Sequence, residues 1–164
     1  MIKLPDTITE KEVKELIKSA RTNKLKLAIV LGFYQALRVS EVISLNKEDI
    51  DMERGFIHIK QSKGKKDRHI PIQEPTKFYL RYLPIEVTRQ ALHKALKSLG
   101  KKIISKDIHF HTLRHSGASY YLNEKRIDIR FIQEFLGHSR LSTTQIYTHV
   151  NPNQLKNAFE NAWR

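Results

Sequence analysis

Two short histidine motifs and one tyrosine carry the groups of this chain that are best suited to chemistry. The motifs are His-Thr-Leu-Arg-His at residues 111–115 and Leu-Gly-His at residues 136–138, and Tyr147 follows the second by nine residues. A tyrosine hydroxyl is a poor nucleophile at neutral pH unless a neighbouring group takes its proton. A phosphate under attack gains negative charge, which arginine and histidine can stabilise without a metal. The set therefore suits covalent attack on a phosphodiester.

The first motif is ambiguous when it is taken alone. His111 and Arg114 are three residues apart at the start of a predicted helix, so they share one face. The unpaired N–H groups at a helix N-terminus favour a bound phosphate and help to keep His111 neutral, so that it can accept a proton. An exposed histidine and arginine on a basic helix is the plainer interpretation of the same pair.

The spacing of His111 and His115 also matches that of paired zinc ligands. Thr112, however, stands where the metalloprotease motif has its glutamate base, and the chain has no cysteine. We therefore expect no metal and no other cofactor, and we expect His115 to be a packed or supporting residue.

Basic residues earlier in the chain allow both a structural and a chemical interpretation. Lys63 lies at the tip of a predicted turn, where its ammonium group could enter a DNA groove or reach a leaving oxygen. A cluster such as Lys63, Lys65 and Lys66 more often makes nonspecific phosphate contacts. Arg38 precedes Glu41 by three residues, which is common in weak surface salt bridges. Spacing alone leaves both interpretations open.

The composition indicates a nucleic-acid partner. The chain has 164 residues, enough for one domain with a substantial core. Its 30 lysines and arginines exceed its 17 aspartates and glutamates, which gives a formal charge of +13. Such a charge is typical of proteins that bind phosphate backbones, although an anionic lipid surface would also attract it.

The sequence also excludes several classes of protein. The absence of cysteine excludes disulfides and thiolate chemistry. No apolar run approaches the ~20 residues of a membrane span, and the N-terminus has no signal-peptide apolar stretch. We therefore expect an intracellular protein of the cytoplasm that does not associate with a membrane.

Hydrophobic periodicity predicts a mainly α domain with a small antiparallel β-hairpin, which is an α+β fold. The hairpin is expected between Gly55 and Ile72, around a basic turn at residues 62–66. Gly100 and Gly137 are interpreted as helix stops, and the polar residues 98–107 as a loop. Helices are expected at residues 9–19, 24–37, from about 38, 78–83, 88–99, 112–122, 129–136, 143–147 and 154–163.

The order and spacing of these pieces closely resemble the tyrosine recombinase (phage integrase) family, particularly its Xer-like members. The resemblance rests on residues 36–45, 63–71, 111–115 and 136–138, followed by Tyr147, and it covers nearly the whole chain. It implies the catalytic-domain fold of that family. Each piece is unremarkable alone, but the series in this order is highly specific.

The resemblance implies a catalytic role for each of the main groups. Arg38 and Arg114 match the arginines that clamp the scissile phosphate, a task that suits the planar, permanently charged guanidinium. Lys63 matches the lysine that protonates the departing 5′ oxygen. Tyr147 matches the nucleophile, which forms a 3′-phosphotyrosyl bond to DNA. A free 5′-hydroxyl can then reverse the attack, so strands are rejoined without ATP or metal.

The resemblance also assigns supporting residues. His111 matches the position that accepts or shares the tyrosine proton, and His138 matches one that hydrogen-bonds the phosphate. Glu41 matches an acidic supporting position. Ala36 stands where many members carry glycine, a departure that removes no catalytic group. The residues expected to contact the DNA itself are Lys65, Lys66, Arg68 and Arg140.

The function that the resemblance implies is site-specific DNA recombination. Two alternatives are a nicking and resealing enzyme like a type IB topoisomerase, and a catalytically silent DNA-binding module. We expect residues 1–164 to be the catalytic domain, a fragment that lacks the N-terminal DNA-gripping domain usual in the family. The partner would be double-stranded DNA in a prokaryotic nucleoid. The tail at residues 153–164, with Leu155, Phe159 and Trp163 at every fourth position, would join protomers into a tetramer on two duplexes.

Overall fold

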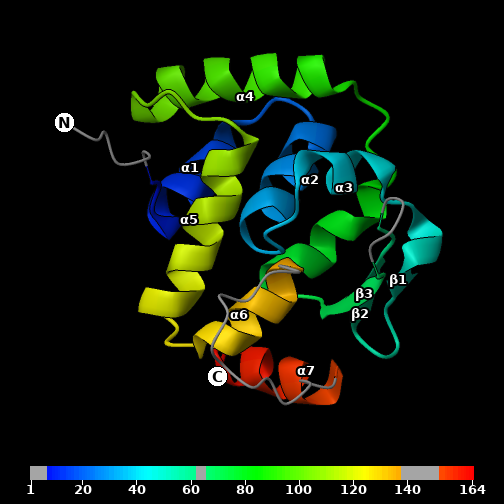
Figure 1. Ribbon diagram of the computed structural model, residues 1–164. Coiled ribbons are helices and arrows are strands. Elements are labelled where there is room, and N and C mark those ends of the chain that lie inside the picture. The colour runs from blue at the N-terminus through cyan, green and yellow to red at the C-terminus, as the bar shows by residue number, and fades with distance from the viewer. Residues whose placement is uncertain (1–6, 62–65, 138–151) are drawn as a thin grey trace.

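A computed structural model describes residues 7–61, 66–137 and 152–164 (Figure 1). It confirms a mainly helical fold with a small antiparallel sheet. The helices are α1 (Glu10–Ser19), α2 (Asn23–Phe33), α3 (Val39–Ser44), α4 (Arg89–Ile104), α5 (Phe110–Asn123), α6 (Ile129–Leu136) and α7 (Pro152–Asn161), with the 3-10 helices η1 (Lys47–Asp49) and η2 (Glu74–Tyr82). The strands are β1 (Ile50–Asp51), β2 (Phe56–Ile59) and β3 (Arg68–Pro71).

Helix α2 lies at the centre of the helical part. Every residue from Leu27 to Phe33 is buried, which explains why the apolar residues of this segment are nearly continuous rather than confined to one stripe. Helices α1, α5 and η2 pack around it. Figure 1 shows α4 across one end of this group and α7 across the other. Helix α5, which carries the first histidine motif, is therefore fixed directly against the core.

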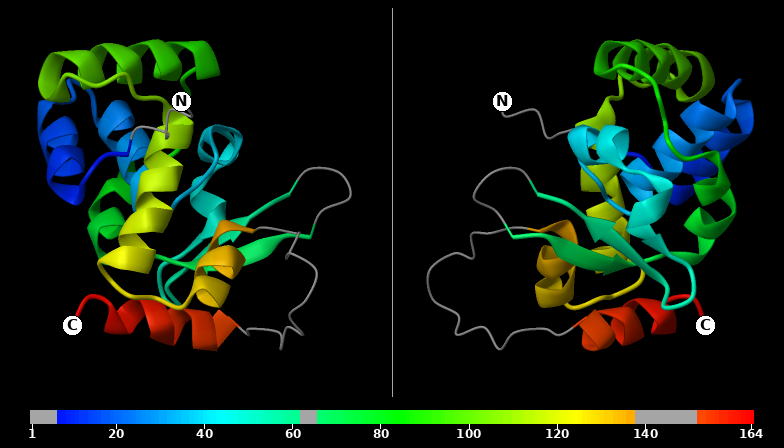
Figure 2. Two further views of the ribbon diagram at one scale, coloured as in Figure 1. Left: turned by 60° about the vertical axis from the view of Figure 1, so that its left-hand side comes forward. Right: turned by 90° about the vertical axis from the view of Figure 1, so that its right-hand side faces the viewer.

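The sheet has the order β1-β2-β3, and both pairs of neighbours are antiparallel. Ile57 of β2 pairs with Ile70 of β3, and both side chains are fully buried. Because side chains alternate along a strand, Arg68 points to the same face as Ile70, and it is buried too. Figure 2 shows the sheet to one side of the helices, with α7 running beneath it.

The prediction of a helix stop at Gly100 is wrong. Helix α4 continues through this glycine to Ile104, so most of the predicted loop at residues 98–107 is helical. Gly100 allows a close approach: a Cβ atom here would lie 2.4 Å from Cγ1 of the buried Ile108 and 2.9 Å from the Lys106 carbonyl oxygen. The glycine at this position is therefore required by close packing and does not mark the end of a helix.

Two other elements differ from the sequence prediction, and a further predicted helix is not tested. Residues 74–82 form a long 3-10 helix where a shorter helix at 78–83 was expected. Strand β1 was not predicted, because two residues are too few to show a periodicity. The helix expected at residues 143–147 lies outside the described part of the chain.

Helix α7 packs on its own domain. Leu155 and Phe159 are buried, and the Phe159 ring stacks on Phe135 of α6 with 4.4 Å between the ring centroids. Trp163 donates a hydrogen bond from Nε1 to Gln73 Oε1 at 2.9 Å. The four-residue repeat of the tail is thus explained by contacts within one chain. No helix among the described residues combines the length and the apolar character that crossing a membrane requires.

Candidate active site

One buried carboxylate gathers charged side chains from separate elements. Glu41 lies on α3, Arg68 begins β3, and Arg38 is the residue that precedes the first turn of α3. Arg114, from the middle of α5, is close enough for its charge to act on Glu41 as well. Segments far apart in the sequence therefore meet at a single acidic group, and the cluster carries a net positive charge.

Glu41 makes its best contacts with Arg68. The Arg68 guanidinium donates from Nη1 to Oε1 at 2.9 Å and from Nη2 to Oε2 at 3.2 Å, which is the bidentate geometry of a strong charge-assisted pair. Both side chains are buried, with 9% and 6% of their surface exposed. Because water is largely excluded, this ion pair is of the kind in which loss of one partner leaves a costly unpaired charge.

Glu41 also fixes the start of α3. As the third residue of the helix it reaches back and accepts a hydrogen bond from the backbone N–H of Arg38, with 2.9 Å between N and Oε2. The Arg38 side chain makes one longer contact, 3.3 Å from Nη1 to Oε1. The predicted Arg38–Glu41 salt bridge therefore exists, but its main component is a helix cap.

The pKa of Glu41 reflects these contacts. Burial would raise it, but the hydrogen bonds and charge of Arg68, the backbone N–H of Arg38 and the charge of Arg114 together outweigh burial. The pKa of the Glu41 carboxyl therefore lies below its ordinary value, and the group is ionised at neutral pH.

Arg114 is held by backbone carbonyls rather than by an acid. Its Nη1 donates to the Ala36 carbonyl at 2.6 Å and its Nη2 to the Leu136 carbonyl at 2.8 Å. Burial, with the nearby charges of Arg38 and Arg68, lowers its pKa to about 10, while Glu41 opposes that shift. Arg114 thus stays charged at neutral pH and ties the loop before α3 to the end of α6.

The backbone at Ala36 explains the glycine found at this position in many members of the resembled family. Ala36 has φ of 50°, in the left-handed region that glycine adopts freely and that costs another residue roughly 1 kcal/mol. Its carbonyl is the one that receives Arg114. Ala36 therefore adopts an unfavourable backbone conformation at the residue whose carbonyl accepts the Arg114 hydrogen bond.

The structure does not support the prediction that Arg68 contacts DNA. Besides its pair with Glu41, Arg68 donates from Nε to the Phe135 carbonyl at 3.3 Å. Gly137 ends α6 with φ of 70°, as predicted, and a Cβ atom there would lie 2.8 Å from Arg68 Cζ. The guanidinium is thus enclosed by protein, and its role is internal to the site.

Arg38 and His111 are the predicted catalytic residues that this part of the structure presents to solvent. The Arg38 side chain is 37% exposed, whereas Arg114 is buried. His111 is exposed in the first turn of α5, one turn before Arg114. An anion arriving at the surface would reach Arg38 first.

A hollow of about 550 Å³ is lined by residues at the starts of α4 and α5 and by Val39, the residue that follows Arg38 in the chain. Sequence reasoning missed these residues, although three polar side chains at the start of one predicted helix were a usable signal. The lining consists of Val39, Arg89, Gln90, His93, His109 and Phe110.

The model of the phage integrase family matches residues 6–84 and 84–154 of this chain. The chain belongs to the phage integrase family. A tyrosine recombinase XerA of Pyrococcus furiosus is 44% identical, with 97% of this chain and 62% of the relative covered. A crystal structure of XerA recombinase has a TM-score of 0.73 at 30% identity, covering 96% of this chain and 65% of that one.

The likeness in fold extends to a recombinase solved with its substrate. XerH bound to its difH substrate matches with a TM-score of 0.69, covering 84% of this chain and 48% of that one, and at 20% identity it shows the fold alone. This chain spans about 62% of the length of the XerA relative.

Several residues that the family resemblance assigns lie outside the described part of the chain. They are Lys63, Lys65, His138, Arg140 and Tyr147. Lys66 is described and exposed, two residues before β3 begins at Arg68. His115 is exposed, which contradicts a packed position, whereas the other expectation for it, a supporting role, stays a prediction. Within the described ranges no group of three or more histidines and acidic residues is arranged to hold a metal ion.

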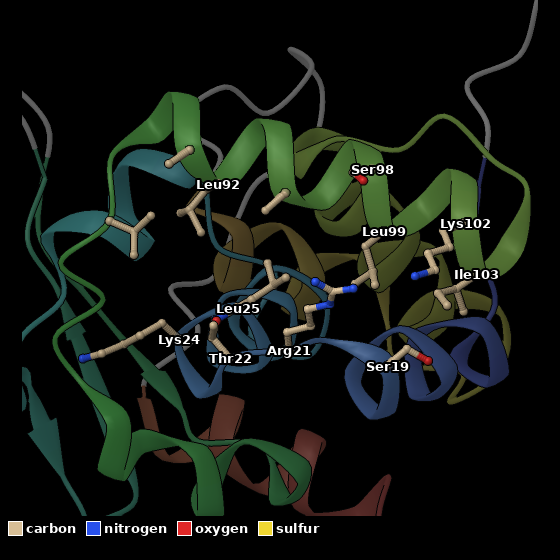
Figure 3. A pocket seen from close by; sticks show the side chains of 13 residues that line it. Ser19, Arg21, Thr22, Lys24, Leu25, Leu92, Ser98, Leu99, Lys102 and Ile103 are labelled. Carbon is tan, nitrogen blue, oxygen red and sulfur yellow. The ribbon is translucent and has the colours of Figure 1, made fainter.

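A second hollow is separate from the cluster. It has a volume of about 410 Å³ and lies between α4 and the junction of α1 and α2 (Figure 3). Its lining includes Leu25 and Leu99, and the Arg21 side chain points into the space between them. None of the residues that line it belongs to the arginine cluster.

The depressed pKa of Glu41 predicts how stability depends on pH. A carboxyl whose folded pKa is lowered stabilises the fold above its unfolded pKa of about 4.5, and this contribution is lost as the pH falls through the folded value. We expect Glu41→Gln to cost about 3 kcal/mol of unfolding free energy at pH 6, measured by urea denaturation. The difference from the unmodified protein should shrink steadily towards pH 3.

The matched control is Glu48→Gln, which removes the same charge from an exposed side chain. It should change the unfolding free energy by no more than about 0.5 kcal/mol at any of these pH values. A deficit in Glu41→Gln that stays constant from pH 6 to pH 3 would show that the carboxylate charge does not stabilise the fold.

Proposed function

We propose that this chain is the catalytic domain, residues 1–164, of a site-specific DNA recombinase. The observation that carries the proposal is the arginine cluster, in which Arg114 is immobilised by two carbonyls and Arg38 stands half-exposed beside it. A site of this kind is prepared for an oxyanion before one arrives. Relatives named tyrosine recombinases, and the XerH structure with its DNA substrate, support a phosphodiester as that anion.

The proposed reaction is an exchange of phosphoester bonds. The Tyr147 oxygen attacks the scissile phosphorus after its proton passes to His111, and a bond forms between the tyrosine and the 3′-phosphate. The bond to the 5′ oxygen breaks as Lys63 supplies that oxygen with a proton. Arg38, Arg114 and His138 stabilise the charge on the nonbridging oxygens. Attack by a second 5′-hydroxyl reverses the steps, so neither ATP nor a metal ion enters the proposal.

The partner in this proposal is double-stranded DNA in a prokaryotic cell. The formal charge of +13 supports strong, salt-dependent attraction to a phosphate backbone. Lys65, Lys66 and Arg140 are proposed as backbone contacts. The hollow lined by Arg89, Gln90 and His93 adds polar and basic groups, and Val39 in its lining directly follows Arg38 in the chain.

The direct test is formation of a covalent protein–DNA adduct. Purified protein is incubated with negatively supercoiled plasmid at low salt in a chelating buffer, quenched with detergent, and examined for DNA-linked protein. We expect an adduct that Tyr147→Phe abolishes and that Arg38→Ala reduces by about 100-fold, since one fixed donor to the transition state is lost. Adduct without strand exchange between two duplexes would favour the topoisomerase-like alternative.

Arg21→Ala is the matched control for Arg38→Ala. It removes the same charge from an exposed arginine in the separate hollow and should leave the rate within about twofold. An equal loss in both variants would mean that only overall charge matters. No adduct from either this chain or the complete gene product would favour a silent DNA-binding module.

We also propose that the tail joins protomers into a tetramer on two duplexes. The contacts of α7 set the condition for this step, because Leu155 and Phe159 are buried in their own domain and must leave it before docking elsewhere. The position of the tail on its own domain provides two sites for fluorescent labels. Met52 and Arg164 line the same hollow beneath the sheet, and both are exposed.

Tail exchange predicts energy transfer between protomers. The chain has no cysteine, so Arg164→Cys can carry a donor dye and Met52→Cys, in a second preparation, an acceptor. A mixture of the two should show no transfer without DNA and clear transfer when plasmid is added. An acceptor at exposed Lys94 on α4, at the opposite end from α7, should give much less. Equal transfer from both acceptors, or none from either, would contradict tail exchange.

A further inference from the structure

Two arginines compete for the one carboxylate of Glu41. Arg68 engages both carboxylate oxygens, at 2.9 and 3.2 Å, while Arg38 reaches one of them at 3.3 Å through a single nitrogen. Oε1 is shared between them. The buried Arg68 therefore binds Glu41 more strongly than the solvent-exposed Arg38 does.

The competing groups differ in what else they can do. Arg68 also donates to the Phe135 carbonyl, so all three of its nitrogens have partners within the protein. Arg114 gives both terminal nitrogens to the carbonyls of Ala36 and Leu136. Arg38 is the solvent-exposed arginine of the cluster, and among the described residues its one side-chain hydrogen bond is the 3.3 Å contact with Glu41.

Removal of Arg68 would change this balance. A buried carboxylate without its bidentate partner is strongly unfavourable, and it recruits whatever cation lies nearest. Arg38 already touches Oε1, and Arg114 is committed elsewhere. Arg38 would turn onto Glu41 and form the full ion pair that Arg68 now supplies. A phosphate would then have to break that pair before it could bind.

We infer that Arg68 is a positioning residue that saturates Glu41 and so keeps the Arg38 guanidinium free for an oxyanion. The inference rests on the proposed function only in taking a phosphate as the anion. It gives Arg68 a role that needs no contact with DNA. It also explains why a basic residue is tolerated on the buried face of β3, where Ile70 is the next inward-facing side chain.

A simpler role would be that of a strut. In that case Arg68 would only brace β3 against α6 through the Phe135 carbonyl. The two roles predict different behaviour when Glu41 is also neutralised. If Arg68 acts by neutralising Glu41, it becomes dispensable once the carboxylate carries no charge. If Arg68 is only structural, its loss has the same effect with or without that charge.

The experiment is a titration with inorganic phosphate, followed through the arginine Nε–Hε signals in ¹H–¹⁵N NMR spectra at constant ionic strength. The Arg38 signal is identified by its loss in Arg38→Lys. We expect phosphate to shift it in the unmodified protein and Arg68→Met to weaken that binding by at least about tenfold. The double variant Arg68→Met/Glu41→Gln should recover to within about threefold of the unmodified protein.

Three results would overturn the inference. They are no phosphate response at Arg38 in the unmodified protein, an affinity that Arg68→Met leaves unchanged, and a loss in Arg68→Met that Glu41→Gln fails to repair. The last result would show that Arg68 only braces β3 against α6. If circular dichroism shows that Arg68→Met is unfolded, Arg68→Lys replaces it, because an ammonium keeps the charge without the bidentate geometry. The same rescue by Glu41→Gln is then required.

The titration is independent of DNA cleavage. A protein that gives no covalent adduct with plasmid, yet shows the phosphate response and its rescue, would lack the proposed function and keep the proposed role of Arg68. A protein that gives the adduct without the rescue would show the reverse.

Discussion

The arrangement of the site depends on one buried carboxylate. Glu41 caps α3 through the Arg38 backbone, pairs with Arg68 at the start of the outer strand, and lies within electrostatic reach of Arg114 on α5. These elements come from distant parts of the chain. Because the carboxylate is nearly excluded from water, each of these interactions is stronger than it would be on the surface. The position of each arginine is set by what Glu41 and the nearby carbonyls leave available.

The cluster is also unbalanced in charge, and this imbalance is the link to function. Three arginines surround one glutamate, so the net charge is 3 − 1 = +2. Burial and the charges of Arg38 and Arg68 lower the pKa of Arg114 to about 10, so the neighbouring guanidiniums repel one another. A phosphodiester under attack carries two negative charges in its transition state, and it would relieve this repulsion while gaining fixed donors.

Much of this could be predicted from the sequence, and the failures have physical causes. The stop at Gly137 and the hairpin followed from local rules, and the resemblance led to Arg38, Glu41 and Arg114. Arg68 was predicted to contact DNA because basic side chains are usually exposed to solvent. Its spacing of two residues from Ile70 in the strand nevertheless places it on the buried face. Gly100 could not be interpreted correctly, since the close approach of Ile108 depends on how α4 meets the following segment. The catalytic roles expected of Arg38, Lys63, His111, Arg114, His138 and Tyr147 all remain predictions.

We infer above all that Arg68 neutralises the Glu41 carboxylate, so that the Arg38 guanidinium remains free to bind an anion. A crystal structure of Arg68→Met tests it most directly, through the separation of the Arg38 guanidinium from the Glu41 carboxylate. The account predicts that the single contact of 3.3 Å becomes a bidentate pair and that the exposed 37% of Arg38 falls sharply. An Arg38 side chain that stays in place, beside a Glu41 compensated by water or protonation, would contradict it.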